Sequence, residues 1–351
     1  MSMFCRILRV QKGTALRIIG RSGTPEKAEG GRLRSMPLIL LRRNETVIID
    51  VHTHLFPAKI AEAALRKMQG NSHTALYSDG TEAGLCACEA RAGVDLAIAQ
   101  PVATNPEKVS HLNDFVLEIN GRDAGSRVRS FGAMHPACRD WERELERLKM
   151  AGVPGIKLHP PYTGVDLDDP RSIAVLRKCR ELDLMVLIHS GRDVGLPGAE
   201  EALPIRVRRA LDAVGPMKLI AGHMGGWGCW EEVLELLPDT GCYLDTAFAL
   251  GTMTPAPDGH AWRAEDLRLL RAEAFCELIA RFGADRVLFG TDSPWADPEE
   301  EIRKIKGLPL QEAEVRRILG DNMAGLLAGR VNAECWRLPG PAAWQAPAPE
   351  T

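Results

Sequence analysis

The sequence lacks the features that would direct it to a membrane or to a nucleic acid. No apolar run in its 351 residues approaches the roughly 20 residues that a membrane-spanning helix needs. The formal net charge is only -3, so no excess of positive charge favours nucleic acid or an anionic lipid surface. We therefore expect a soluble protein that acts on a small-molecule substrate, and the composition leaves a homodimer open.

Paired cysteines are also missing. The nine cysteines are scattered, none forms a CxxC pair, and Cys86 and Cys88 are too close for an ordinary zinc knuckle. Scattered cysteines of this kind are typical of a reducing compartment. We therefore expect reduced thiols and a cytoplasmic location.

The two ends of the chain differ from its middle. Residues 1–45 are rich in Arg and Gly and have no apolar periodicity, which predicts a disordered extension or a start upstream of a natural Met36. Residues 331–351 are rich in Pro and Ala and are expected to form a disordered tail. Residues 46–330 remain as the folded domain.

Within 46–330, strand-like runs alternate with amphipathic helical stretches. The expected strands are 47–54, 96–102, 128–134, 155–160, 184–190, 218–224, 242–248 and 286–293. The expected helices include 107–120, 141–150, 172–182, 205–214, 231–237 and 264–282, with closing helices at 310–319 and 322–328. Eight strand–helix units predict an α/β fold of the (β/α)8, or TIM-barrel, type. An open doubly wound sheet is the alternative, but no GxGxxG or GxxxxGK[ST] motif follows the first strand.

The first strand, VIIDVHTH (47–54), ends in three polar residues, Asp50, His52 and His54. Side chains alternate along a strand, so we expect these three on one face. Polar groups on a buried face are costly unless something satisfies them. Two histidines two residues apart suit a divalent metal ion, and a pair of hydrogen-bonded core histidines is the alternative.

Other expected strands end in the same kinds of residue. In a barrel the chemistry lies at the C-terminal ends of the strands. Six of the nine histidines fall at strand ends, which is far from a random placement. The strand-end residues after the first strand are His135, Lys157, His159, His189, His223, Asp245 and Asp292.

The ordered motifs resemble a known family. They are IIDVHTHLFP, GIKLHP, LIHSG, AGHMGG, LDTAF, LFGTDSPW and ILGDNMAGLL. Together they resemble the amidohydrolase superfamily, and within it the amidohydrolase-related branch of aminocarboxymuconate-semialdehyde decarboxylase, related aromatic-acid decarboxylases and hydrolases. The resemblance covers roughly residues 46–330.

The resemblance implies roles for particular residues. His52, His54, His189 and Asp292 would bind one divalent ion, with Zn²⁺ expected first and Mn²⁺ next. His223 would stand beside the metal and polarise the substrate, and Asp292 would also handle a proton. Such a ligand set suits a catalytic ion that lowers the pKa of its bound water to about 7.

Four further residues are weaker candidates for substrate binding: Lys157, His159, Arg192 and Trp295. A carboxylated Lys157 could instead bridge two metal ions, as in other branches of the superfamily. A fork-shaped cation at Arg192 could hold a substrate carboxylate.

These residues favour a metal-dependent hydrolase acting on a C–N or C–O bond of a small, carboxylated molecule. The alternative is a metal-dependent decarboxylase of an aromatic or unsaturated acid, which would use the same residues. A barrel that binds metal without catalysis is a third interpretation, and the separate acid–base set argues against it.

Overall fold

The structure is a computed structural model, and it describes residues 46–122, 126–328, 330 and 336. The expected N-terminal extension therefore lies outside the described residues, as does the expected C-terminal tail apart from Trp336. In the described part of the chain, no helix combines the length and the apolar character needed to cross a membrane.

Strands and helices alternate along the described chain. The strands are β1 (Ile49–Thr53), β2 (Leu96–Ala99), β3 (Val128–Ser130), β4 (Gly132–Ala133), β5 (Gly155–Leu158), β6 (Met185–Ile188), β7 (Leu219–Ala221), β8 (Tyr243–Asp245) and β9 (Val287–Leu288). The helices up to β8 are α1 (Ala58–Ser72), α2 (Glu82–Ala92), η2 (Pro106–Lys108), α3 (Val109–Asn120), α4 (Trp141–Met150), α5 (Pro160–Thr163), α6 (Pro170–Glu181), α7 (Pro204–Val214) and α8 (Trp230–Leu236). Those that follow are α9 (Ala272–Phe282), η3 (Ala284–Arg286), α10 (Pro298–Lys306), α11 (Glu312–Arg316), η4 (Arg317–Asp321) and α12 (Asn322–Leu327).

The strands form two parallel sheets, in the orders β1-β2-β3 and β4-β5-β6-β7-β8-β9. Only Phe131 separates β3 from β4, and its amide donates to the Ala99 carbonyl at 3.0 Å. Between β9 and β1 no ladder forms, but single bonds cross the gap, such as Val51 N to Phe289 O at 2.9 Å. The predicted TIM-barrel fold is confirmed, with the difference that the barrel is not closed into one continuous ladder.

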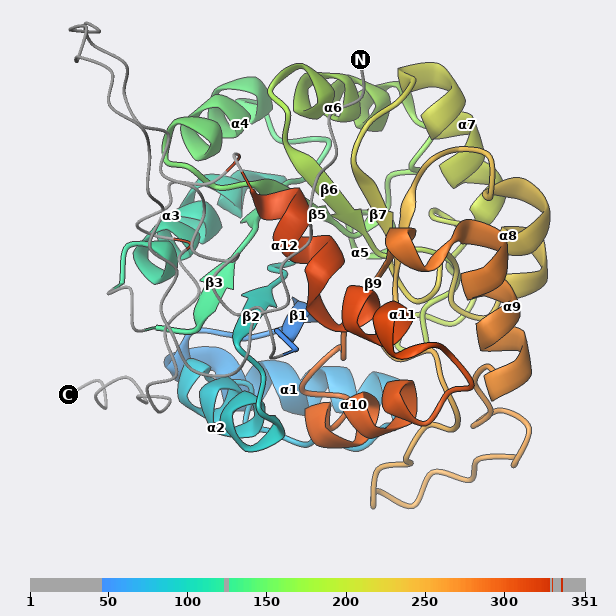
Figure 1. The fold of residues 1–351 in the computed structure, drawn as a ribbon. Helices are drawn as coiled ribbons and strands as arrows, with labels where there is room; N and C mark the ends of the chain where they lie inside the picture. The colour runs from blue at the N-terminus through green and yellow to red at the C-terminus, as the bar shows by residue number, and fades with distance from the viewer. Residues whose placement is uncertain (1–45, 123–125, 329, 331–335, 337–351) are drawn as a thin grey trace, which may run out of the picture. The chain divides into compact units, whose positions relative to one another are not determined.

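Apolar side chains fill both faces of the strands. One cluster combines alternate strand residues, such as Ile98 and Leu187, with Met323 and Leu327 of α12. The intervening strand residues, such as Ala97 and Ile188, pack with residues of the surrounding helices. Figure 1 shows the helices arranged around the strands, with α12 crossing in front of them. The site described below therefore rests on a packed interior.

One expected helix is partly wrong. Residues 264–271, predicted as the start of a helix, precede α9 and include two isolated strand-like pairings, Leu250 with Leu270 and Thr252 with Arg268. Leu267 and Leu269 pack in an apolar cluster with Phe248 and Met253, so tertiary contacts override the local helical pattern.

Candidate metal centre and its cavity

Five predicted site residues gather where strands end. His52 lies in β1 and His54 directly follows it, His189 follows β6, His223 follows β7 and Asp292 follows β9. All five line one cavity of about 570 Å³. The structure therefore brings these five predicted residues together at the C-terminal ends of the strands.

A bulge in β1 decides which face the first histidines occupy. Asp50 pairs with Ala97 and Thr53 pairs with Ala99, so three residue steps in β1 match two in β2. The extra residue puts Asp50 on the opposite face from His52 and His54. The expectation that all three share a face is therefore wrong.

Asp50 instead ties β1 to the end of β9 on the side of α2. Its carboxylate accepts from the amide and the hydroxyl of Thr291, at 3.1 and 2.5 Å, and from the His52 amide at 3.1 Å. Burial raises the pKa of Asp50 to about 7. Asp50 thus supports the backbone of His52 and does not contact its imidazole.

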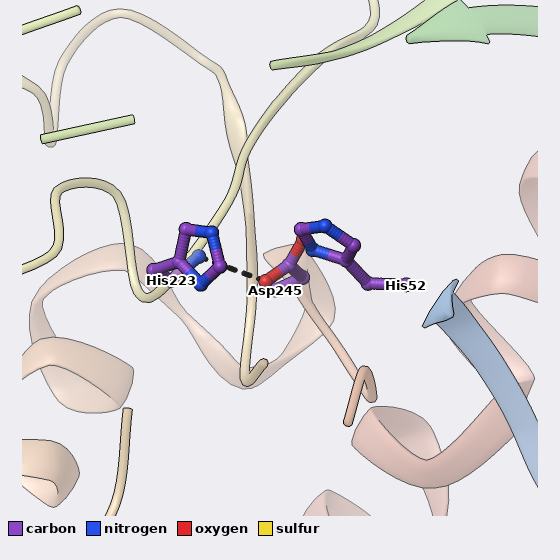
Figure 2. A group of neighbouring side chains, drawn as sticks. All are labelled: His52, His223 and Asp245. Carbon is purple, nitrogen blue, oxygen red and sulfur yellow. Dashed lines mark hydrogen bonds and ion pairs between the residues drawn. The ribbon is translucent and has the colours of Figure 1, made fainter. Parts of the chain in front are cut away.

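Asp245 fixes the ring of His52. Its Oδ2 lies 2.9 Å from His52 Nδ1, and its Oδ1 accepts from the His223 amide at 2.9 Å. Figure 2 shows the carboxylate of Asp245 between the two histidines. Because Nδ1 donates to a carboxylate, Nε2 of His52 carries the lone pair that a metal ion needs. Lys157 Nζ lies 2.8 Å from this nitrogen.

His52, His54 and Asp292 form one candidate ligand group. His54 Nε2 lies 3.1 Å and His52 Nε2 3.6 Å from Asp292 Oδ1, and one ligand atom from each residue lies within 4.8 Å of the others. Two imidazole nitrogens and a carboxylate oxygen suit a divalent ion such as Zn²⁺ or Mn²⁺. The fourth predicted ligand, His189, is not part of this group.

His189 and His223 instead face each other. Nε2 of His189 can only donate to the Arg192 carbonyl, at 2.9 Å, and Nδ1 of His223 can only donate to the Ala247 carbonyl, at 2.9 Å. When both rings are neutral, the two remaining nitrogens, 3.0 Å apart, each present a lone pair to the other. Only a proton or a metal ion nearby would satisfy this arrangement, so these residues also fit a bound cation.

Burial keeps these histidines neutral. It lowers the pKa of His189 to about 4 and that of His223 to about 3, and neighbouring positive charges add to the effect. For His223, neutrality has a chemical consequence. Its one N–H is given to Ala247, so its Nε2 accepts a proton and does not donate one. The expected polarising role would need a protonated ring.

Asp292, unlike these neutral histidines, carries a charge. Burial alone would raise its pKa, but the hydrogen bond with His54 and the neighbouring basic side chains, Lys157 among them, hold that pKa below its ordinary value. Asp292 is therefore an ionised carboxylate on the cavity wall, available as a ligand or as a proton acceptor.

The backbone is held in unusual conformations at this site. His223 and Asp292 have φ angles of 57° and 67°, in the left-handed region that costs free energy for residues other than glycine. Gly290 lies so close to His52 that an added Cβ would be 2.9 Å from the His52 Cβ. Such constraints are typical of functional sites.

The weaker candidates separate into two pairs. His159 and Trp295 line the cavity, and the Trp295 ring meets His54 edge-on with centroids 5.4 Å apart. Lys157 is buried and bonds His52 without lining the cavity. Arg192 is exposed and does not line the cavity either, although its backbone carbonyl holds His189. Among these four, only His159 and Trp295 can therefore touch a ligand there directly.

Sequence reasoning missed Asp193. Its Oδ2 lies 3.5 Å from His159 Nε2 and 3.7 Å from His189 Nε2, and the His159 ring stacks on His189 with centroids 4.3 Å apart. Burial raises the pKa of Asp193. In the sequence, Asp193 is marked only as an acid four residues after a histidine at a strand end. That pattern is too common to identify a site residue.

The chain belongs to the amidohydrolase family, whose pattern it matches over residues 49–327. No curated protein sequence matches it significantly.

Solved structures with similar folds include decarboxylases. The 2,6-dihydroxybenzoate decarboxylase from Rhizobium is 15% identical, with 81% of this chain and 99% of that chain covered and a TM-score of 0.57. The 5-carboxyvanillate decarboxylase from Novosphingobium aromaticivorans, complexed with manganese and a nitrobenzoic acid, is 16% identical, with 82% and 97% covered and a TM-score of 0.56. A putative 2-pyrone-4,6-dicarboxylic acid hydrolase from Pseudomonas putida is 16% identical, with 81% and 98% covered and a TM-score of 0.54. At these identities the likeness establishes the fold alone.

Proposed function

We propose that this protein is a metal-dependent decarboxylase of an aromatic or unsaturated carboxylic acid. The observation that carries the proposal is the cavity itself. A group of two histidines and an aspartate stands beside walls that include Tyr162, Trp227, Phe248 and Trp295. Such walls favour a planar, conjugated molecule over a flexible polar one. The decarboxylases among proteins of similar fold support the same reaction class, in preference to the hydrolase that the motifs alone favoured.

His52, His54 and Asp292 would hold one divalent ion. Bound there, the ion would neutralise the substrate carboxylate and draw electron density from it. The manganese bound by the 5-carboxyvanillate decarboxylase makes Mn²⁺ as reasonable a choice as Zn²⁺. Elemental analysis of protein never exposed to chelator should find close to one divalent ion per chain. Two ions, together with a mass increase for a carboxylated Lys157, would favour a binuclear centre.

The chain's own residues then move a proton. When the bond to the carboxyl carbon breaks, CO₂ leaves and the electron pair stays on the neighbouring carbon, which must receive a proton. Asp292 and His223 line the cavity and both can accept a proton from water before passing it on. Asp245 keeps His52 oriented throughout, because its carboxylate holds Nδ1.

A hydrolase is the second candidate. Asp292 is an ionised carboxylate that could take a proton from an attacking water, and one protein of similar fold is named a putative hydrolase. Both reactions can be followed with metal-loaded enzyme, unsaturated acids and lactones in ¹⁸O-labelled water. Stoichiometric CO₂ with solvent hydrogen on the vacated carbon supports the decarboxylase. Product carrying ¹⁸O in a new carboxylate, without CO₂, would establish hydrolysis instead.

A further inference from the structure

The cavity is larger than the proposed reacting group requires. A single benzene ring fits in a cavity of about 150 Å³. The cavity measures about 570 Å³, so an acid with one ring would leave more than half of the space to water. Much of the remaining wall is apolar, and apolar walls gain free energy when they contact hydrocarbon and not water.

Two helices supply this apolar wall. Ile60, Ala64 and Met68 are spaced by four residues, so they lie on one face of α1. Leu112 and Phe115 come from α3, and both also line the cavity. We call these five residues the apolar arm. Its most exposed member, Ile60, is 52% exposed.

The apolar arm leads to the opening of the cavity. The exposed residues that line it all come from α1 or from residues 104–111; they are Ile60, Lys67, Asn71, Thr104, Asn105, Lys108 and His111. The histidines and Asp292, in contrast, lie on strand ends. A ligand held at the metal centre would therefore extend between α1 and α3.

We propose that the apolar arm is a subsite for a hydrocarbon substituent, so that the substrate is a carboxylic acid whose conjugated part carries an apolar group several carbons long. This inference rests on the proposed function only for the position of the carboxylate at the metal centre. Turnover is not needed to test it, because the subsite acts on binding.

The experiment is a calorimetric titration of the full-length, metal-loaded protein with benzoates that carry alkyl chains at position 3 or 4, from none to hexyl. Burial of each methylene should lower Kd by about fourfold until the apolar arm is filled. A Kd that does not change with chain length in either series, or no binding of any member, would overturn the proposal.

Variants of two adjacent alanines locate the effect. Ala64→Phe fills the apolar arm, so it should abolish the gain from the alkyl chain and leave benzoate binding within about twofold. Ala63→Phe is the matched control, because Ala63 is exposed on the same helix and does not line the cavity. Met68→Trp provides a second filling variant in case Ala64→Phe lowers the thermal midpoint.

The two proposals fail differently. If the alkyl series gains affinity in the native protein and loses that gain in both filling variants, the subsite stands even when no CO₂ is released. If the filling variants bind the hexyl compound as tightly as the native protein does, the subsite is wrong, whatever reaction is catalysed.

Discussion

The four histidines at the centre form two pairs that differ in the kind of oxygen atom that their rings contact. His52 and His54 contact carboxylates, those of Asp245 and Asp292. His189 and His223 contact backbone carbonyls. The carboxylate on Nδ1 of His52 makes its Nε2 a better electron donor, whereas Nε2 of His54 lies beside Asp292, itself a candidate ligand. A neutral carbonyl only fixes the tautomer. Under the proposed function, the first pair would bind the metal ion, and the second pair would serve proton transfer and orientation.

The largest expected effect concerns His52 and His54, the pair that contacts carboxylates. His52→Ala or His54→Ala should remove both the bound metal and essentially all CO₂ release, because each takes away a ligand nitrogen. Metal content by elemental analysis and activity would be measured on the same samples. His260→Ala, a change at an exposed histidine, serves as the control and should alter neither. Retention of full metal content in His52→Ala would contradict the proposal that this pair binds the metal ion.

A smaller effect is expected for the carbonyl-backed pair. His223→Asn should keep most of its metal but lose roughly 10²-fold or more in rate, as expected for removing a positioned acid–base group. Rate and metal content must again be read together. If this variant loses metal as readily as His52→Ala, both pairs bind metal and the distinction disappears.

The carboxylate behind His52 can be tested directly. Asp245→Asn should weaken metal affinity by roughly 10- to 100-fold, the usual cost of losing a partner of a ligating histidine. Competition with a coloured chelator would measure the affinity. Asp50→Asn is the matched control, since Asp50 is equally buried but contacts the backbone of His52 and not its ring. Equal losses of affinity in both variants would contradict the role given to Asp245.

The smallest effect is a dependence of stability on pH. The pKa of His223 falls from 6.5 to about 3 in the folded protein because the ring is buried. Below pH 6.5 the unfolded chain therefore binds a proton at His223 that the metal-free folded protein does not bind. The free energy of unfolding consequently falls as the pH falls. The free energy of unfolding of the native protein, minus that of His223→Asn, should therefore fall by about 1.4 kcal/mol per pH unit below 6.5. Urea unfolding at pH 7.5 and 5.5 would reveal it, and a difference independent of pH would contradict the burial effect.

Much of the fold and part of the site could be predicted from the sequence. Alternating apolar runs predicted the order of strands and helices, and polar residues at the ends of those runs predicted a group of side chains that the structure places around one cavity. These features are local, because a strand and the residue that ends it are neighbours in the chain. The family match agrees with the resemblance of the motifs.

Other features depend on contacts between distant segments. The bulge that turns Asp50 away from His52 is defined only by the register of β1 against β2. The apolar arm exists only because α1 and α3 line the same cavity, and each helix alone resembles an ordinary core-facing stripe. The structure of residues 264–271, wrongly predicted as helix, likewise follows from pairing with residues 250–252.

The exposed residues at the rim of the cavity affect how charged molecules associate with it. Lys67, Lys108 and His111 are exposed there, and no acid is found among the exposed lining residues in the described ranges. An ionised acid approaching this rim is attracted to it, so its rate of association should fall with added salt. The proposed decarboxylation would consume a proton and leave a product with one negative charge fewer. Under the proposed function, the same rim would hold the product less strongly than the substrate, which would reduce inhibition of turnover by the product.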